Sequence, residues 1–87
     1  MQQAEILGIL SKYIANDVLD GKDIGLEPST PLLEWGVLNS LEIVKLVTFM
    51  SREFGVSVPG DKVTATYFKD LQALADLVVE LTERGRS

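Results

Sequence analysis

The sequence predicts an all-α fold: a small four-helix bundle with a long loop between helices one and two and a short third helix. Three stretches repeat apolar residues at steps of three and four, the spacing of one buried helix face. No alternating stretch is long enough to build a sheet. Helices with such apolar stripes bury them against one another, which gives a bundle.

The first helix is predicted to run from about Gln3 to Leu19. Asp20-Gly21 should end it, because glycine readily adopts the left-handed conformation found after helix C-termini. Six apolar residues define its inner face: Ile6, Leu7, Leu10, Tyr13, Ile14 and Val18.

A long connection from Asp20 to Leu38 follows, without sustained periodicity. We expect it to fold back over the helices, because it contains several apolar residues: Ile24, Leu26, Leu32, Leu33, Trp35, Val37 and Leu38. Pro31 after Ser29-Thr30 predicts a single turn over residues 32–35. Trp35 is interpreted as a partly buried anchor of this loop rather than a ligand platform.

The second helix should begin at Asn39 or Ser40 and end near Phe54, before Gly55. Asn39 suits the N-cap, and Glu42 occupies the capping-box position. The expected core stripe is Ile43, Val47, Met50 and Phe54, with Leu46 beside it. Other apolar residues lie off that stripe, so the helix is either central or presents an apolar face to a partner: Leu41, Val44 and Phe49.

The rest of the chain completes a single domain over residues 1–87, with a polar, frayed tail from about residue 83. Residues 56–59 predict an extended connector, and a short third helix is expected within Asp61–Phe68, capped by Asp61 or Thr64. Asp70 should cap the last helix. The inner face of that helix comprises Leu71, Leu74, Ala75, Leu77, Val78 and Leu81.

Composition excludes several function classes. A net charge of −5 argues against nucleic-acid binding, which needs clustered Lys and Arg. With no Cys and no His, we expect no disulfide and no metal site. No apolar run reaches the roughly 18–20 residues that span a bilayer, and the N-terminus lacks signal-peptide features, so a cytoplasmic protein without membrane contact is expected.

Ser40 is the candidate functional residue. It follows the loop ending in Gly36-Val37-Leu38-Asn39 and opens a strongly apolar helix. Without His or Cys to activate it, it is not expected to be a nucleophile of the chain's own, and no catalytic residue is predicted. Serine and asparagine at a helix start are more often caps, so the residues alone leave both a cap and an attachment point open.

The stretch Gly36–Leu41 closely resembles the serine motif of acyl and peptidyl carrier proteins. The similarity extends to Phe54–Pro59 and Tyr67–Leu71, nearly the whole chain. It implies that Ser40 carries 4'-phosphopantetheine, transferred from coenzyme A by a phosphopantetheinyl transferase, whose thiol holds an acyl or aminoacyl group. The family usually has aspartate at the position of Asn39, where it is thought to assist the metal of the modifying enzyme.

A finer resemblance involves residues 31–40, 43–46 and 67–71, which look like those of free-standing carriers that handle proline on its way to pyrrole-2-carboxylate. It implies an adenylation enzyme that loads L-proline, a flavin-dependent dehydrogenase that oxidises it, and a downstream acyltransferase or synthase. A fatty-acid, polyketide or aryl carrier remains an alternative. So does a helical interaction module without a prosthetic group.

The outward face of the second helix is expected to recognise partner enzymes. Fatty-acid carriers, which this chain resembles, have an acidic second helix, whereas here Glu42 and Glu53 are balanced by Lys45 and Arg52. Recognition should therefore depend on short-range packing more than on long-range attraction. The alternative is that Lys45 and Arg52 only solvate the helix and pair with neighbouring acids, and the sequence leaves both interpretations open. The predicted partner residues are Leu41, Val44, Lys45, Thr48 and Arg52.

Overall fold

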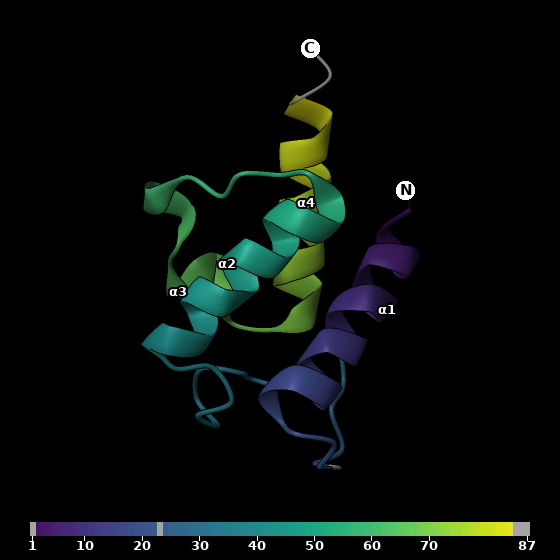
Figure 1. Ribbon diagram of the computed structural model, residues 1–87, viewed down its shortest axis with the longest axis vertical. Helices are drawn as coiled ribbons and strands as arrows, with labels where there is room; N and C mark the ends of the chain where they lie inside the picture. Colours follow the sequence, from purple (N-terminus) through teal and green to yellow (C-terminus); the bar gives the residue numbers. More distant parts are fainter. Residues whose placement is uncertain (1, 23, 85–87) are drawn as a thin grey trace.

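The computed structural model describes residues 2–22 and 24–84, and these form helices, turns and loops without any strand (Figure 1). The helices are α1 (Gln3–Tyr13), α2 (Ser40–Phe54), α3 (Ala65–Phe68) and α4 (Leu71–Arg84). The predicted all-α class, the long loop before α2 and the short third helix are confirmed. Residues 85–87 of the expected tail lie outside the described residues.

Helix α4 is the common packing partner of the other helices. Helices α1, α2 and α3 each pack on α4, and α2 crosses in front of it in Figure 1. All of its buried face comes from the predicted stripe: Leu71, Leu74, Ala75, Leu77 and Val78. Burying each large apolar side chain contributes about 1.5–3 kcal/mol, so this face stabilises the whole bundle.

The first helix changes from an α-helix to a π-helix near its C-terminal end. Helix α1 continues into a π-helical turn over Ile14–Val18, so the helical stretch ends one residue before the predicted Leu19. Asp20 and Gly21 both have positive φ, 56° and 80°, and the Gly21 N–H donates to the Ala15 carbonyl at 2.9 Å. The predicted stop at Asp20-Gly21 is confirmed.

The long loop folds back onto the bundle, as predicted. Leu32, Val37 and Leu38 are buried. The Leu32 N–H donates to the Lys69 carbonyl at 2.8 Å, and the Gln72 N–H donates to the Pro28 carbonyl at 3.1 Å. These bonds attach the loop to the start of α4. Because the loop is held there, it fixes the position of the N-terminus of α2 on the bundle.

The interpretation of Trp35 as a partly buried anchor is wrong, because its side chain is 57% exposed. The predicted turn does form, with the Trp35 N–H donating to the Pro31 carbonyl at 2.9 Å. Leu32, Val37 and Leu38 already supply the buried side chains of this part of the loop. Trp35 is therefore left on the surface.

The core contact of α2 is narrower than the predicted stripe. Leu46 and Met50, one turn apart, are the buried residues of α2. Val47 and Phe54, expected in the core, are only partly buried and pack at its edge, as does Ile43. Helix α2 is rotated about its own axis so that Leu46 and Met50 face inward. The spacing of apolar residues in the sequence does not determine this rotation.

The segment between α2 and α4 follows the prediction with a later start for α3. Gly55, with φ 68°, ends α2, and Val56 is buried in the connector. A 3-10 turn over Gly60–Lys62 precedes α3, so the helical part of the predicted Asp61–Phe68 segment is split in two. Thr64 occupies the N-cap of α3 without a side-chain cap bond.

Three polar contacts stabilise the region of α3 and α4. The Asp70 carboxylate accepts a hydrogen bond from the Ala73 N–H at 2.8 Å, which confirms it as the cap of α4. Lys62 Nζ lies 3.0 Å from Glu80 Oε2 and 3.3 Å from the Tyr67 hydroxyl. The hydrogen bond to Glu80 is the main cause that raises the pKa of Lys62 above its ordinary value.

Candidate functional site

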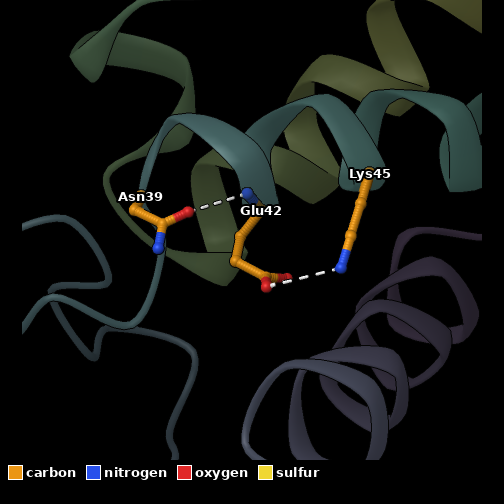
Figure 2. A network of polar contacts seen from close by, with 3 residues as sticks. All are labelled: Asn39, Glu42 and Lys45. Carbon is orange, nitrogen blue, oxygen red and sulfur yellow. Dashed lines mark hydrogen bonds and ion pairs between the residues drawn. The ribbon is translucent and has the colours of Figure 1, made fainter.

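Ser40 is the first residue of α2 and is exposed, where the anchored loop enters the helix. The N-cap is Asn39, in extended conformation, whose side-chain oxygen accepts the Glu42 N–H at 2.9 Å (Figure 2). Its carbonyl accepts the Ile43 N–H at 2.9 Å. Because Asn39 provides the cap, the Ser40 hydroxyl is not required for it.

Glu42 does not complete the predicted capping box. Its carboxylate extends toward Lys45, with Oε1 3.9 Å from Lys45 Nζ (Figure 2). The Lys45 side chain is 57% exposed, so this pair at the limit of ion-pair distance contributes little to stability. The positive charge of Lys45 does offset the negative charge of Glu42 beside Ser40.

The N-terminus of α2 is chemically suited to a phosphate ester on Ser40. Asn39 accepts from the N–H of Glu42 and of Ile43, which leaves the Ser40 and Leu41 N–H groups at the open end of the helix. These groups and the positive end of the helix dipole favour an anion at that position. The chain has no His or Cys to act as a base toward Ser40, and the described residues contain no metal-ligand cluster.

The predicted partner residues lie on two neighbouring ridges of α2. One ridge, at steps of four, is Ser40, Val44, Thr48 and Arg52; the other is Leu41, Lys45, Phe49 and Glu53. The five predicted partner residues are all exposed, with Leu41 at 61% and Val44 at 62%. A leucine and a valine this exposed give the surface an apolar component.

These ridges border a groove of about 700 Å³ between α2 and the end of the first helix. Four predicted partner residues line it: Val44, Lys45, Thr48 and Arg52. The other lining residues are Tyr13, Asp17, Phe49 and Glu53. Of these, the sequence pattern offered only Phe49 as part of a possible partner-binding face. The four-residue spacing of Tyr13 and Asp17 places them on one face of a helix, but which helix this face meets depends on the crossing of α1 and α2.

An aromatic contact joins the two helices at the groove. The rings of Tyr13 and Phe49 stack with centroids 4.1 Å apart, and Phe49 meets Phe54 edge to face at 6.3 Å. Burial raises the pKa of Tyr13 above 10.0, and the negative charges of Asp17 and Glu42 raise it further. Two acidic residues, one from each helix, therefore act on the Tyr13 phenol.

Within residues 2–22 and 24–84, no helix combines the length and apolar character that crossing a membrane requires.

Comparison with known proteins identifies a family and two informative relatives. Residues 4–78 match the model of the phosphopantetheine attachment site. The chain is 35% identical over 72 residues to the probable acyl carrier protein PigG of Serratia sp. (strain ATCC 39006), covering 83% of both proteins. It also matches a chain in a structure titled "Crystal structure of FAD-dependent dehydrogenase", with a TM-score of 0.77 and 36% identity over 80% of this chain and 99% of that one.

Proposed function

Because this chain belongs to the phosphopantetheine attachment-site family of carrier proteins, we propose that Ser40 bears its covalently attached 4'-phosphopantetheine. Proteins of this family are generally non-catalytic and work with partner enzymes. When bound, the group supplies a thiol that holds a substrate as a thioester. The chain's own residues position that group and present it to other proteins.

The observation that carries this proposal is the division of roles between Asn39 and Ser40. Asn39 forms the helix cap, and Ser40 is left exposed with a hydroxyl that the cap does not use. The N–H groups at the start of α2 suit the phosphate that joins the arm to serine. With no base of its own beside Ser40, the chain depends on a phosphopantetheinyl transferase to activate the hydroxyl.

We further propose that the cargo is L-proline, which is oxidised on the arm to pyrrole-2-carboxylate. The resemblance of residues 31–40 and 67–71 to the proline-handling carriers supports this cargo. The partners would be a prolyl-loading adenylation enzyme, a flavin-dependent dehydrogenase and a downstream acyltransferase or synthase, all in the cytoplasm. A fatty-acid, polyketide or aryl cargo is the competing assignment.

The dehydrogenase partner has support from the size of the matched structural chain. The match covers 99% of that chain but 80% of this one, so that chain is shorter than the present 87 residues. It is smaller than one typical domain of about 100–150 residues, and much too small for a flavin dehydrogenase. A carrier-sized chain therefore occurs in a structure titled as an FAD-dependent dehydrogenase.

For partner recognition we propose the exposed ridges of α2. Leu41 and Val44 supply apolar contact area, and Lys45, Thr48 and Arg52 supply polar contacts around it. Side chains that become fully covered at the centre of a protein interface carry most of its energy, and charges at its rim contribute less. Partner enzymes would then recognise α2 by shape at short range.

The attachment site is tested by incubating the protein with coenzyme A and a promiscuous phosphopantetheinyl transferase, followed by intact mass. The wild type should gain one phosphopantetheine, and Ser40→Ala should gain none while keeping its helical circular dichroism. Ser51→Ala, another exposed serine of α2, is the matched control and should be modified normally. Modification of Ser40→Ala would refute the assignment.

The cargo is tested on the modified protein. Incubation with a prolyl-adenylating enzyme should add one prolyl group to the arm, and a flavin-dependent dehydrogenase should then produce the mass loss expected for oxidation to pyrrole. Preferential loading by a fatty-acyl or aryl-acid ligase would favour the competing assignment while leaving Ser40 as the attachment site.

A further inference from the structure

We infer that Lys62 is a positioning residue for the proposed modification at Ser40, because it holds α3 in place and α3 in turn holds the loop that ends at Ser40. This role depends on the proposed attachment of phosphopantetheine to Ser40. Lys62 acts together with Tyr67 and Glu80, and these three residues are called the lysine cluster below.

Lys62 attaches an otherwise exposed segment to the bundle. Residues 59–66, all of which the structure describes, are exposed except for Lys62, whose side chain is only 14% exposed. This segment includes the 3-10 turn over Gly60–Lys62 and the first residues of α3, whose N-cap Thr64 makes no side-chain cap bond. A segment with few buried side chains opens locally at a low cost in free energy. Its attachment to α4 therefore depends strongly on Lys62.

The contacts of Lys62 join the 3-10 turn, α3 and α4 at one point. Lys62 Nζ lies 3.0 Å from Glu80 Oε2 on α4, 3.3 Å from the Tyr67 hydroxyl on α3, and 4.8 Å from the centre of the Tyr67 ring. The Oε2 atom of Glu80 is shielded from solvent. Removing the lysine takes away a positive charge held against a shielded carboxylate oxygen, which costs more than losing an exposed ion pair. The lysine cluster therefore fixes α3 on α4.

Backbone hydrogen bonds connect the end of α3 to the residues that precede Ser40. The carbonyl of Lys69, the residue directly after α3, accepts the Leu32 N–H at 2.8 Å. The Leu32 carbonyl in turn accepts the Leu38 N–H at 3.2 Å and the N–H of the preceding residue at 2.8 Å. Because Leu38 lies two residues before Ser40, the position of α3 bears on the position of Ser40 through two hydrogen-bonded steps.

Buried side chains at both ends of this path keep it rigid. Phe68, next to Tyr67 of the lysine cluster, is 1% exposed, and Leu32 and Leu38 are 0% and 3% exposed. Protein interiors are close-packed, so a displacement of one buried residue has to be accommodated by its neighbours. If α3 moves away from α4, we therefore expect the Leu32 N–H to lose its acceptor and the loop before Ser40 to become more mobile.

Loss of this positioning should appear in the KM of the modifying enzyme. When only a fraction of the protein molecules present a residue correctly, the apparent affinity of an enzyme for the protein falls by that fraction. We expect Lys62→Met to raise the KM of a phosphopantetheinyl transferase for this protein about fivefold, which corresponds to correct presentation by about one molecule in five. The kcat should change little, because the molecules that are bound already present Ser40 correctly.

The experiment measures steady-state modification of the full chain by a phosphopantetheinyl transferase with coenzyme A. Lys12→Met is the matched control, because it removes the same charge from an exposed position on α1, and it should leave KM unchanged. Lys62→Arg should keep KM near that of the wild type, because a guanidinium can also donate to the Glu80 carboxylate. An unchanged KM for Lys62→Met, an equal rise for Lys12→Met, or a loss confined to kcat would each overturn the inferred role.

Amide hydrogen exchange of the unmodified protein, followed by NMR, separates positioning from general stability. Lys62→Met should speed exchange at Leu32, Leu38 and Phe68 while the amides of Met50 and Leu77 in the core keep their rates. An equal increase at all of these amides would mean that the lysine cluster only stabilises the fold, and the role in positioning would be wrong.

A second variant and a prior measurement complete the test. Glu80→Gln keeps the shape of the side chain but removes its charge, and it should show the same pattern of KM and exchange if circular dichroism finds Lys62→Met unfolded. Intact mass of modified Ser40→Ala is measured first. Modification that persists in that variant would refute the attachment site and with it the role of Lys62, whereas an unchanged KM in a protein modified only at Ser40 would refute the role of Lys62 alone.

Discussion

The two long faces of α2 carry similar apolar residues, but those on one face are buried and those on the other are exposed. On the inner face, Leu46 and Met50 are completely buried against the bundle. On the outer face, Leu41 and Val44 expose more than half of their surface, at 61% and 62%. Valine is a weaker helix former than alanine, leucine or lysine, so Val44 adds neither burial nor propensity to the fold. The inner face therefore maintains the bundle, and the exposed outer face is the surface that we propose for binding partners.

The charges of the outer face lead to the same conclusion. The whole protein has a net charge of −5, yet on α2 Glu42 and Glu53 are matched by Lys45 and Arg52. A neutral surface on an acidic protein gives partners little long-range attraction. The exposed apolar residues must therefore provide most of the contact energy if partners dock here.

The largest effect should come from truncating the inner face. Met50→Ala should lower the free energy of unfolding by about 2–5 kcal/mol, because it leaves a cavity in the core. Val44→Ala on the outer face should change it by no more than about 0.5 kcal/mol. Urea denaturation measures both, and equal losses for the two variants would contradict the division of α2 into two faces.

Local signals in the sequence predicted most of the fold and the position of Ser40. The caps Asn39 and Asp70 and the stops at Gly21 and Gly55 depend on neighbouring residues, so they can be read from the chain directly. The rotation of α2 about its axis cannot be read from the chain, because it depends on how α2 crosses α4. Without that rotation, the apolar spacing placed Val47 and Phe54 in the core, whereas the structure leaves them partly buried.

The groove between α2 and the end of the first helix, and the exposure of Trp35, could not be predicted from the sequence for a related reason. The groove combines Tyr13 and Asp17 with residues of α2, and only the packing of two helices brings them together. Trp35 is exposed because other loop residues occupy the buried positions. Competition among apolar residues for a limited core is a tertiary property, and composition does not reveal which of them is excluded.

The next largest effect tests recognition by the outer face. With phosphopantetheine already installed, Val44→Asp should slow loading by the cognate adenylation enzyme roughly tenfold, equivalent to about 1.4 kcal/mol of lost contact energy. Lys45→Ala should have a smaller effect, and Leu41→Ala a larger one than Lys45→Ala. Loading rates should change only mildly near 0.15 M salt, where the Debye length is about 8 Å.

Steady-state aminoacylation at low and moderate salt distinguishes the two mechanisms. A steep loss of rate with salt, or a Lys45→Ala defect larger than that of Val44→Asp, would mean that charge governs this interface. The apolar residues of the outer face would then need another explanation.

A smaller effect tests the division of roles at the N-terminus of α2. Asn39→Ala should lower the free energy of unfolding by about 1 kcal/mol, because the Glu42 N–H loses its acceptor. Asn39→Asp, which has the residue usual in the family, should retain the cap. If thermal melts show that Ser40→Ala destabilises the protein and Asn39→Ala does not, then Ser40 is the structural cap.

The smallest effect concerns the electrostatics of the groove beside the outer face. Burial and the charges of Asp17 and Glu42 hold the pKa of Tyr13 above 10.0 in the folded protein, which favours the neutral phenol. Its contribution to stability is therefore complete below pH 10.0 and is lost as the pH rises through the folded-state pKa. Asp17→Asn should lower the pKa of Tyr13 but leave it above 10.0, because burial is the larger cause.

Phenolate absorbance in a Tyr67→Phe background measures this pKa, with Glu5→Gln as the control for removing an exposed acid elsewhere on the first helix. An equal shift in both variants would mean that Tyr13 responds to net charge, and that Asp17 has no particular influence on the groove.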